Sequence, residues 1–167
     1  MGIIDTHAHC TYGELANRID EVVKNALEHN VTRILCVCCT LEEAKRAIEI
    51  AEKYDIFDCA FGYHPEEADN FYDSDFKDLR EILSHPKMVA LGEIGMDYHY
   101  TKENKEKQKQ MFIRQIQLAN ELDLPILIHM RDATLDTLEI LKEYPCKGIM
   151  HCYSGSLESA KIILNLG

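Results

Sequence analysis

The sequence contains no tryptophan, and it has no apolar run long enough to cross a membrane. A membrane-spanning helix needs about 20 consecutive apolar residues, and charged or polar side chains interrupt every apolar stretch here well before that length. The amino-terminal segment also lacks the basic region and long apolar core of a secretory signal. These absences argue against a helical membrane protein and predict a cytoplasmic location.

Basic residues are scarce: the sequence has 18 lysines and arginines and 29 aspartates and glutamates, which gives a net charge of −11. A protein that binds nucleic acid without specificity presents a broad basic surface, so the charge excludes that class. It does not exclude a nucleic-acid substrate held at a metal centre, because bound cations are often the largest local charges in a site.

The sequence also lacks a disulfide framework and the motifs of covalent catalysis. Its seven cysteines are scattered without the spacing of a disulfide-rich domain, so we expect free thiols in a reducing compartment. Cys36 and Cys38 in "RILCVCCT" are either small apolar groups of a buried strand or metal ligands, and the first interpretation is favoured. No G-x-S-x-G elbow or Walker loop occurs, so metal-activated water is a better candidate than a serine or cysteine nucleophile.

What the sequence does contain is a regular alternation of strand-like and helix-like segments. Apolar, β-branched runs begin near residues 2, 33, 56, 88, 125 and 148. Between them lie helical patterns, such as residues 15–30 ending at Asn30 and a helix opening with the capping pair Thr40 and Glu43. Strands that are apolar along their whole length and alternate with helices predict an α/β fold with a parallel sheet. No linker divides residues 1–167, so we expect a single domain.

Polar side chains capable of binding metal lie at or just beyond the carboxyl ends of these strands. His7 and His9 are two residues apart in an extended segment, so they share a face and can grip one ion. A lone H-x-H pair is equally consistent with solvated histidines at a strand end. Five further polar residues end the other strands: His64, Glu93, His129, Arg131 and His151. A parallel barrel brings all strand ends together, whereas an open doubly wound sheet joins only neighbouring ends, so we expect a TIM-type barrel.

This ligand set predicts a two-metal site. His7 and His9 would hold one ion and His129 and His151 a second, with Glu93 bridging both through its two oxygens. Imidazole and carboxylate donors suit Zn²⁺, Mn²⁺ or similar ions rather than Ca²⁺, and two such ions can activate water for attack at phosphorus. Arg131 shares the face of His129 and either binds a phosphate bidentately or pairs with a loop carboxylate.

Five stretches carry a resemblance to a known family: "IDTHAHC", "GYHPEE", "GEIGMDYHY", "PILIHMRDA" and "HCYSGS". In this order and spacing the sequence resembles, from end to end, the TatD family of metal-dependent deoxyribonucleases, which are amidohydrolase-like barrels. The resemblance implies cleavage of DNA phosphodiesters by two divalent ions (Zn, Mn or Mg). It implies that Glu93 and His64 are catalytic, that His64 and Arg131 face the substrate, and that the metal ligands are His7, His9, Glu93, His129 and His151.

The resemblance also implies that this domain is incomplete at its carboxyl end. A barrel of this type has eight βα units in about 250 residues, and only six units are expected here. The family's last ligand, an aspartate on the final strand, would lie beyond Gly167, so full activity of this chain alone is doubtful. The open edges of such a barrel would recruit other chains. The favoured explanation of the missing units is that this chain is a fragment of a longer polypeptide. The alternatives are that another chain covers the gap, or that the protein folds as an open barrel that associates.

Two alternative functions and two further carboxylates stay open. A small-molecule amidohydrolase or lactonase would use the same metal centre, and a catalytically impaired truncated form would keep only metal binding. Asp97, four residues after Glu93, either orients a ligand or caps a loop, with the loop role favoured. Asp5 lies on the same face of the strand as His7 and His9, which allows a role next to the ligands.

Overall fold

The structure, a computed structural model, describes residues 2–100 and 102–166. Its strands are β1 (Ile3–Ala8), β2 (Val31–Cys38), β3 (Phe57–Phe61), β4 (Met88–Asp97), β5 (Ile126–Arg131) and β6 (Gly148–Met150). Its α-helices are α1 (Ile19–Glu28), α2 (Leu41–Lys53), α3 (Asp73–Leu83), α4 (Lys105–Glu121), α5 (Thr134–Glu143) and α6 (Leu157–Leu164), with short 3₁₀ helices η1 (Leu15–Asn17) and η2 (Pro65–Glu67). The expected alternation is therefore confirmed.

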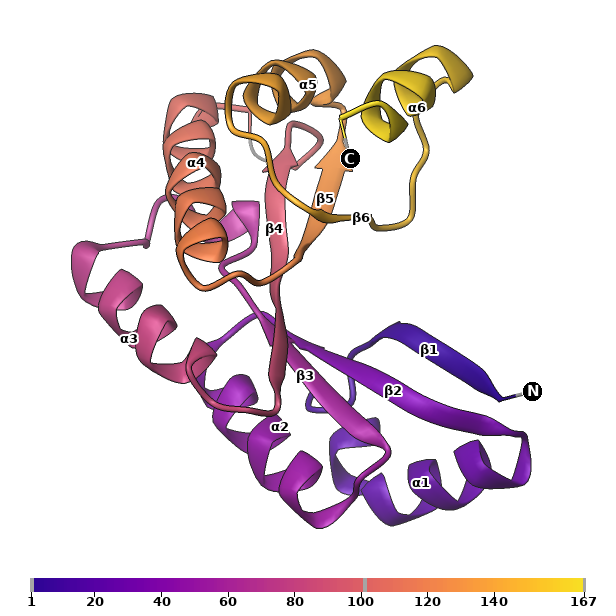
Figure 1. Cartoon of the computed structure of the whole chain (residues 1–167). Helices are drawn as coiled ribbons and strands as arrows, with labels where there is room; N and C mark the ends of the chain where they lie inside the picture. The colour runs from indigo at the N-terminus through magenta and orange to yellow at the C-terminus, as the bar shows by residue number, and fades with distance from the viewer. Residues whose placement is uncertain (1, 101, 167) are drawn as a thin grey trace.

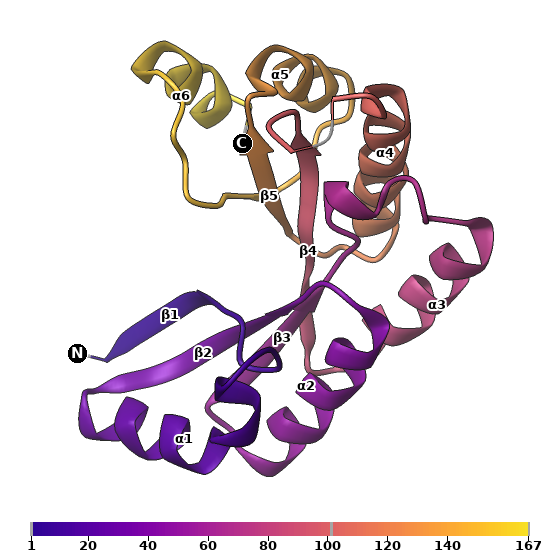
Figure 2. The ribbon, with the colours of Figure 1, turned by 180° about the vertical axis from the view of Figure 1, so that it is seen from behind.

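The strands form one parallel sheet in the order β1-β2-β3-β4-β5-β6. Figure 1 shows that the sheet twists strongly, so that β4 and β5 stand steeply across β2 and β3. Seen from behind in Figure 2, β1 and α6 again lie on the side opposite α3 and α4. Six parallel βα units in sequence order are the expected open part of a barrel, and all six strands deliver their carboxyl ends to one rim.

The core lies between the sheet and the helices that cover its outer face. Phe57, Phe61, Leu91, Phe112 and Ile116 are completely buried. Burial of one such side chain contributes about 1.5–3 kcal/mol, so these residues fix the strands that carry the polar rim. None of the described helices combines the length and apolar character needed to span a membrane.

The first helical segment differs from its expected extent. Residues 15–30 were expected to form one helix, but η1 and α1 are separated at Arg18, whose backbone leaves the helical region (φ −130°, ψ 30°). The Arg18 side chain instead makes an ion pair with Glu21 at 2.5 Å. Asn30 ends the segment with a left-handed φ of 61°, which asparagine tolerates well. The Thr40 cap is as expected, since its hydroxyl accepts a hydrogen bond from the Glu43 N–H at 3.2 Å.

The two edge strands expose apolar side chains. Ile3 and Ile4 on β1 are 57% and 61% exposed, and Ile149 on β6 is 52% exposed. Within the described residues, β1 pairs only with β2 and β6 only with β5. The open edges that the sequence implied are thus present in the fold.

Candidate metal centre

Glu93 lies at the centre of a cluster that joins β1, β4 and β5. Its carboxylate is buried, with Oε2 lying 3.2 Å from His7 Nε2 and Oε1 lying 2.8 Å from His129 Nδ1. Each carboxylate oxygen therefore faces a histidine from a different strand, which is the arrangement expected of a bridging ligand. Burial alone would raise the pKa of Glu93, but hydrogen bonds from His129 and His7 outweigh burial and lower it, so the group is a carboxylate.

His7, His9 and Glu93 form a compact donor set. His7 Nε2 lies 3.3 Å from His9 Nε2, and one ligand atom from each of the three residues lies within 4.8 Å of the others. Two donors each about 2.1 Å from an ion are about 3.0–3.4 Å apart at octahedral or tetrahedral angles. The observed separations of 3.2 and 3.3 Å match that requirement.

The tautomer of His9 also suits metal binding. His9 Nδ1 lies 3.0 Å from the carbonyl oxygen of Val37 on β2. A carbonyl only accepts hydrogen bonds, so neutral His9 carries its proton on Nδ1 and turns the Nε2 lone pair toward His7 and Glu93. This carbonyl-held imidazole is the usual arrangement behind a metal-bound histidine.

His129 is held at both ring nitrogens. Opposite the Glu93 contact, its Nε2 lies 2.9 Å from Asp97 Oδ2, and Asp97 is almost fully buried. Burial would lower the pKa of His129, but the hydrogen bonds to Glu93 and Asp97 raise it. Asp97 also accepts hydrogen bonds from the backbone of His99 and Tyr100 at 2.8 and 3.0 Å. It therefore caps a loop, as the sequence suggested, and orients His129 as well.

His64 and His151 approach the cluster from two sides. His64, His129 and Glu93 form a second donor set within 4.8 Å, and the rings of His64 and His129 make an edge contact with centroids 4.5 Å apart. The ring of His151 stacks on His7 with centroids 3.5 Å apart. The structure thus brings all five expected metal ligands and His64 together, with His151 against His7 and His64 against His129.

The hydrogen bonding of His64 distinguishes it from His9. The Glu66 backbone N–H and the Glu66 carboxylate oxygen Oε2 both lie 3.4 Å from His64 Nδ1, so Glu66 engages this ring nitrogen and leaves Nε2 for the cluster. Burial, and then the neighbouring His129, lower the pKa of His64 to about 4, which keeps the ring neutral near pH 7. His64 Nε2 is therefore the ring nitrogen that faces the donor set with Glu93 and His129.

Two buried glutamines of α4 hold the loops that carry these residues. Gln108 accepts from the Asp97 N–H at 2.8 Å and donates to the Asp97 carbonyl at 2.9 Å. Gln115 makes the same pair of bonds to Tyr63, at 2.8 and 3.0 Å, directly before His64. Sequence reasoning missed both glutamines. Their signal is the seven-residue spacing on a helix face shared with Met111 and Phe112, which are buried.

The remaining polar candidates lie at the margin. Arg131 is exposed and its Nη1 donates to the Tyr100 hydroxyl at 3.2 Å. Asp5 is exposed and accepts from the His7 backbone N–H at 3.1 Å, so it contacts the backbone of β1 rather than the donor set. Cys36 and Cys38 are buried free thiols, and neither occurs in a compact donor set among the described residues.

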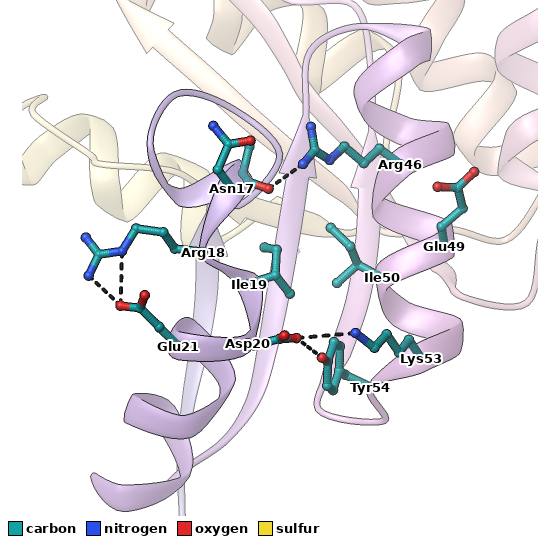
Figure 3. Close-up of a pocket in the computed structure, with 11 residues that line it drawn as sticks. Asn17, Arg18, Ile19, Asp20, Glu21, Arg46, Glu49, Ile50, Lys53 and Tyr54 are labelled. Atoms are coloured by element: carbon teal, nitrogen blue, oxygen red, sulfur yellow. Dashed lines mark hydrogen bonds and ion pairs between the residues drawn. The ribbon is translucent and has the colours of Figure 1, made fainter.

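A cavity of about 530 Å³ opens over the cluster, lined by His64, Glu93, His129, Met130, Arg131, His151, Cys152 and Ser154. Figure 3 shows a different pocket of about 470 Å³ between the start of α1 and the second half of α2. Four of its charged groups pair with one another: Arg18 pairs with Glu21, and Asp20 accepts from Lys53 and also from the Tyr54 hydroxyl. The cavity over Glu93 is the candidate site, because His64, Glu93 and His129, which form a compact donor set, line it.

The fold and the cluster together define a class: barrel-type α/β proteins that gather histidines and a carboxylate at the carboxyl ends of parallel strands. Comparison with known proteins gives the family. The family described as TatD related DNase matches residues 4–167, and the chain belongs to this TatD family of metal-dependent hydrolases.

Relatives and solved structures agree with that assignment. The chain is 42% identical to the uncharacterized metal-dependent hydrolase YabD of Bacillus subtilis (strain 168) over 162 residues, covering 95% of this chain and 64% of YabD. It is 26% identical to the 3'-5' ssDNA/RNA exonuclease TatD of Shigella flexneri serotype 5b, covering 99% of this chain and 65% of that protein. The crystal structure of YJJV, a TatD homolog from Escherichia coli K12, superposes with a TM-score of 0.92 at 28% identity over 98% of this chain and 65% of YJJV. The chain thus spans just under two thirds of these relatives, and its barrel-type fold is confirmed.

Proposed function

We propose that this chain carries the metal centre of a hydrolase that cleaves DNA phosphodiester bonds with two divalent ions. One observation carries the proposal: the two oxygens of Glu93 face His7 at 3.2 Å and His129 at 2.8 Å, from opposite sides of one buried carboxylate. A single ion needs no such two-sided carboxylate. The family relationship supports the same chemistry, since one relative is named a 3'-5' ssDNA/RNA exonuclease.

In this proposal His7, His9 and Glu93 hold one ion, and Glu93, His129 and His151 hold the other. The ions, of the Zn, Mn or Mg type, would supply water of lowered pKa and positive charge for the phosphoryl oxygens. His151 faces the cluster through its stack on His7, and burial and then the neighbouring His7 lower its pKa. Its imidazole is therefore neutral and has a lone pair available.

The other polar residues act on the substrate. His64 presents its Nε2 to a phosphate oxygen in the cavity, because its Nδ1 is engaged by Glu66. Arg131, on the cavity wall, presents a guanidinium that can bind two phosphate oxygens at once. Asp97 keeps the His129 ring in place. A cytoplasmic location is proposed with this function, and seven free thiols support a reducing compartment.

The test is hydrolysis of an end-labelled single-stranded oligonucleotide by the purified chain in Mn²⁺, Zn²⁺ or Mg²⁺, read as fragments on a denaturing gel. We expect cleavage that EDTA abolishes and that Glu93→Gln lowers by at least about 100-fold, since this substitution removes the shared charge. A panel of amides and lactones is assayed beside it.

Two results would contradict the proposal. Hydrolysis of an amide or lactone without cleavage of the oligonucleotide would favour a small-molecule amidohydrolase with the same metal centre. Metal binding without hydrolysis of any of these substrates would identify a catalytically impaired form.

A further inference from the structure

The loop that follows β4 contacts the end of β5, the loop after it and the start of α5 beside the candidate metal centre. The Tyr98 hydroxyl donates to Asp136 at 2.6 Å, and His99 Nδ1 lies 3.1 Å from Asp132. The loops meet again where the Arg131 guanidinium lies over the Tyr100 ring, 4.8 Å from its centroid. The position of Tyr100 is thus tied to Arg131, which lines the cavity over Glu93.

The Tyr100 side chain is not packed into the core. Its side chain is 61% exposed, and its described ring contacts are the Arg131 guanidinium and an edge contact with His99 at 4.8 Å. A large aromatic ring left in solvent beside an arginine is typical of a binding surface rather than of a core. It lies one side chain away from the proposed catalytic cavity.

The charge of the chain reverses in this region. Residues 98–114 contain five basic and two acidic side chains, although the whole chain has 18 basic and 29 acidic residues. Three of these basic groups are neutralised: Lys107 by Asp69, Lys109 by Asp136 and Arg114 by Asp73.

Lys102 and Lys105 are different. Both are exposed, and neither has a carboxylate oxygen within 4.0 Å in the part of the chain that the structure describes. Lys105 stacks over Tyr98 at 4.3 Å, which holds its ammonium on the same loop. Two positive charges without a carboxylate partner among the described residues therefore lie two and five positions after Tyr100 in the sequence.

We propose that Tyr100, Arg131, Lys102 and Lys105 form a subsite for a single-stranded nucleic acid, next to the phosphate that is cleaved. The proposal rests on the proposed function and specifies its substrate. An unstacked base lies on the exposed face of Tyr100, Arg131 contacts the phosphate at the cavity, and the two lysines contact the phosphates that follow.

Aromatic and basic groups together favour a single strand over other polyanions. A duplex keeps its base faces stacked inside, so it gains nothing from an exposed tyrosine, whereas every base of a single strand has a free π-face. An acidic polypeptide would use the lysines but not the ring. The negative charge of the rest of the chain then directs the strand along this one basic path.

The test measures binding without catalysis. Fluorescence anisotropy of a labelled twelve-residue thymidine strand is recorded with the purified chain in EDTA, so that no cleavage occurs. We expect Tyr100→Ala to raise Kd by about 5- to 150-fold, the loss of one base–aromatic stack, whereas Tyr100→Phe, which keeps the ring and loses only the hydroxyl that accepts from Arg131, should raise Kd much less. The exposed position of Tyr100 allows either side chain, and circular dichroism checks the fold.

A second variant tests the charges. Lys102→Ala/Lys105→Ala is expected to reduce the slope of log K against log salt by about 0.7 for each lysine. Lys142→Ala, an exposed lysine in the last turn of α5, is the matched control and should leave the slope unchanged. Duplex of the same sequence should bind Tyr100→Ala and wild type equally.

Three results would overturn the subsite: equal Kd for wild type and Tyr100→Ala, an unchanged salt slope in the double variant, or displacement of the strand by polyglutamate at equal charge concentration. The last result would identify a site for acidic polypeptides. The function itself is tested separately with bis(p-nitrophenyl) phosphate and Mn²⁺. Tyr100-dependent binding without hydrolysis contradicts only the proposed function, and hydrolysis without Tyr100-dependent binding contradicts only the subsite.

Discussion

Asp97 holds His129 from the side opposite Glu93, with 2.9 Å between Asp97 Oδ2 and His129 Nε2. The contact fixes the ring so that Nδ1 faces Glu93 at 2.8 Å. A carboxylate behind a histidine ligand sets both its orientation and its basicity. A residue whose sequence context favoured a loop cap therefore also orients a histidine of the candidate metal centre.

Asp97→Asn should weaken metal affinity by about 10- to 100-fold, the usual effect of losing such a support. Competition with a chromophoric chelator measures it. Asp132→Asn, an exposed carboxylate that contacts His99 instead, is the control and should bind metal as wild type does. Equal affinities for the two variants would show that Asp97 only caps its loop.

Gln115→Leu should lower the free energy of unfolding by about 2–3 kcal/mol. The variant keeps the side-chain size but leaves the Tyr63 N–H and carbonyl without their partner, and an unpaired buried polar group costs about 1–3 kcal/mol. Urea denaturation measures the change. Gln117→Leu, on the exposed face of the same helix, should stay within about 0.5 kcal/mol of wild type; a similar loss in both variants would contradict the role assigned to the buried amide.

Gly95→Ala should destabilise the protein by at least about 3 kcal/mol. Gly95 has a φ of 145°, and a Cβ there would lie 2.0 Å from the backbone oxygen of His129, so β5 must move away. Gly13 also has a positive φ, 59°, but a Cβ there meets nothing within 4 Å. Gly13→Ala should therefore cost only about 1–2 kcal/mol. Thermal unfolding of the two variants then separates the steric clash at position 95 from the backbone strain that both positions share.

The contact of Asp136 with Tyr98 and Lys109 predicts a pH dependence of stability. The hydrogen bond from Tyr98, and then Lys109 at 2.9 Å, lower the pKa of Asp136. A lowered folded-state pKa contributes stability above the unfolded value of about 3.9 and loses it as pH falls through the folded value. Wild type should exceed Asp136→Asn in urea midpoint at pH 7, and the difference should shrink between about pH 5 and pH 3. A difference that is constant over this range would exclude the carboxylate as its source.

The sequence predicted the strands and the rim because both depend on short patterns. Apolar runs such as "MVALGEIG" mark buried parallel strands, and the histidines and the glutamate in or just after the carboxyl-terminal halves of the strands lie where parallel strand ends meet. The break at Arg18 was not predictable in this way, since apolar spacing continues through it. The contacts at the break are the ion pair of Arg18 with Glu21 and the hydrogen bond from Arg46 to the Ala16 carbonyl.

The finer parts of the centre depend on distances that no local pattern encodes. Of the glutamines in α4, the sequence alone does not say which meet a backbone loop, because that depends on where β3 and β4 end relative to the helix. The two contacts of the His129 ring likewise join residues that are distant in sequence: Glu93 is 36 positions from His129, and Asp97 is 32 positions from it. Spacing along a strand shows which side chains share a face, whereas it does not show which of them touch.

The most direct test of the metal centre is the metal content of the chain after loading with Mn²⁺ or Zn²⁺ and desalting, measured by inductively coupled plasma mass spectrometry. Two ions per wild-type chain are expected, with one lost in His9→Ala and both lost or strongly depleted in Glu93→Ala, because Glu93 is the shared ligand. Wild-type metal content in Glu93→Ala would contradict the account.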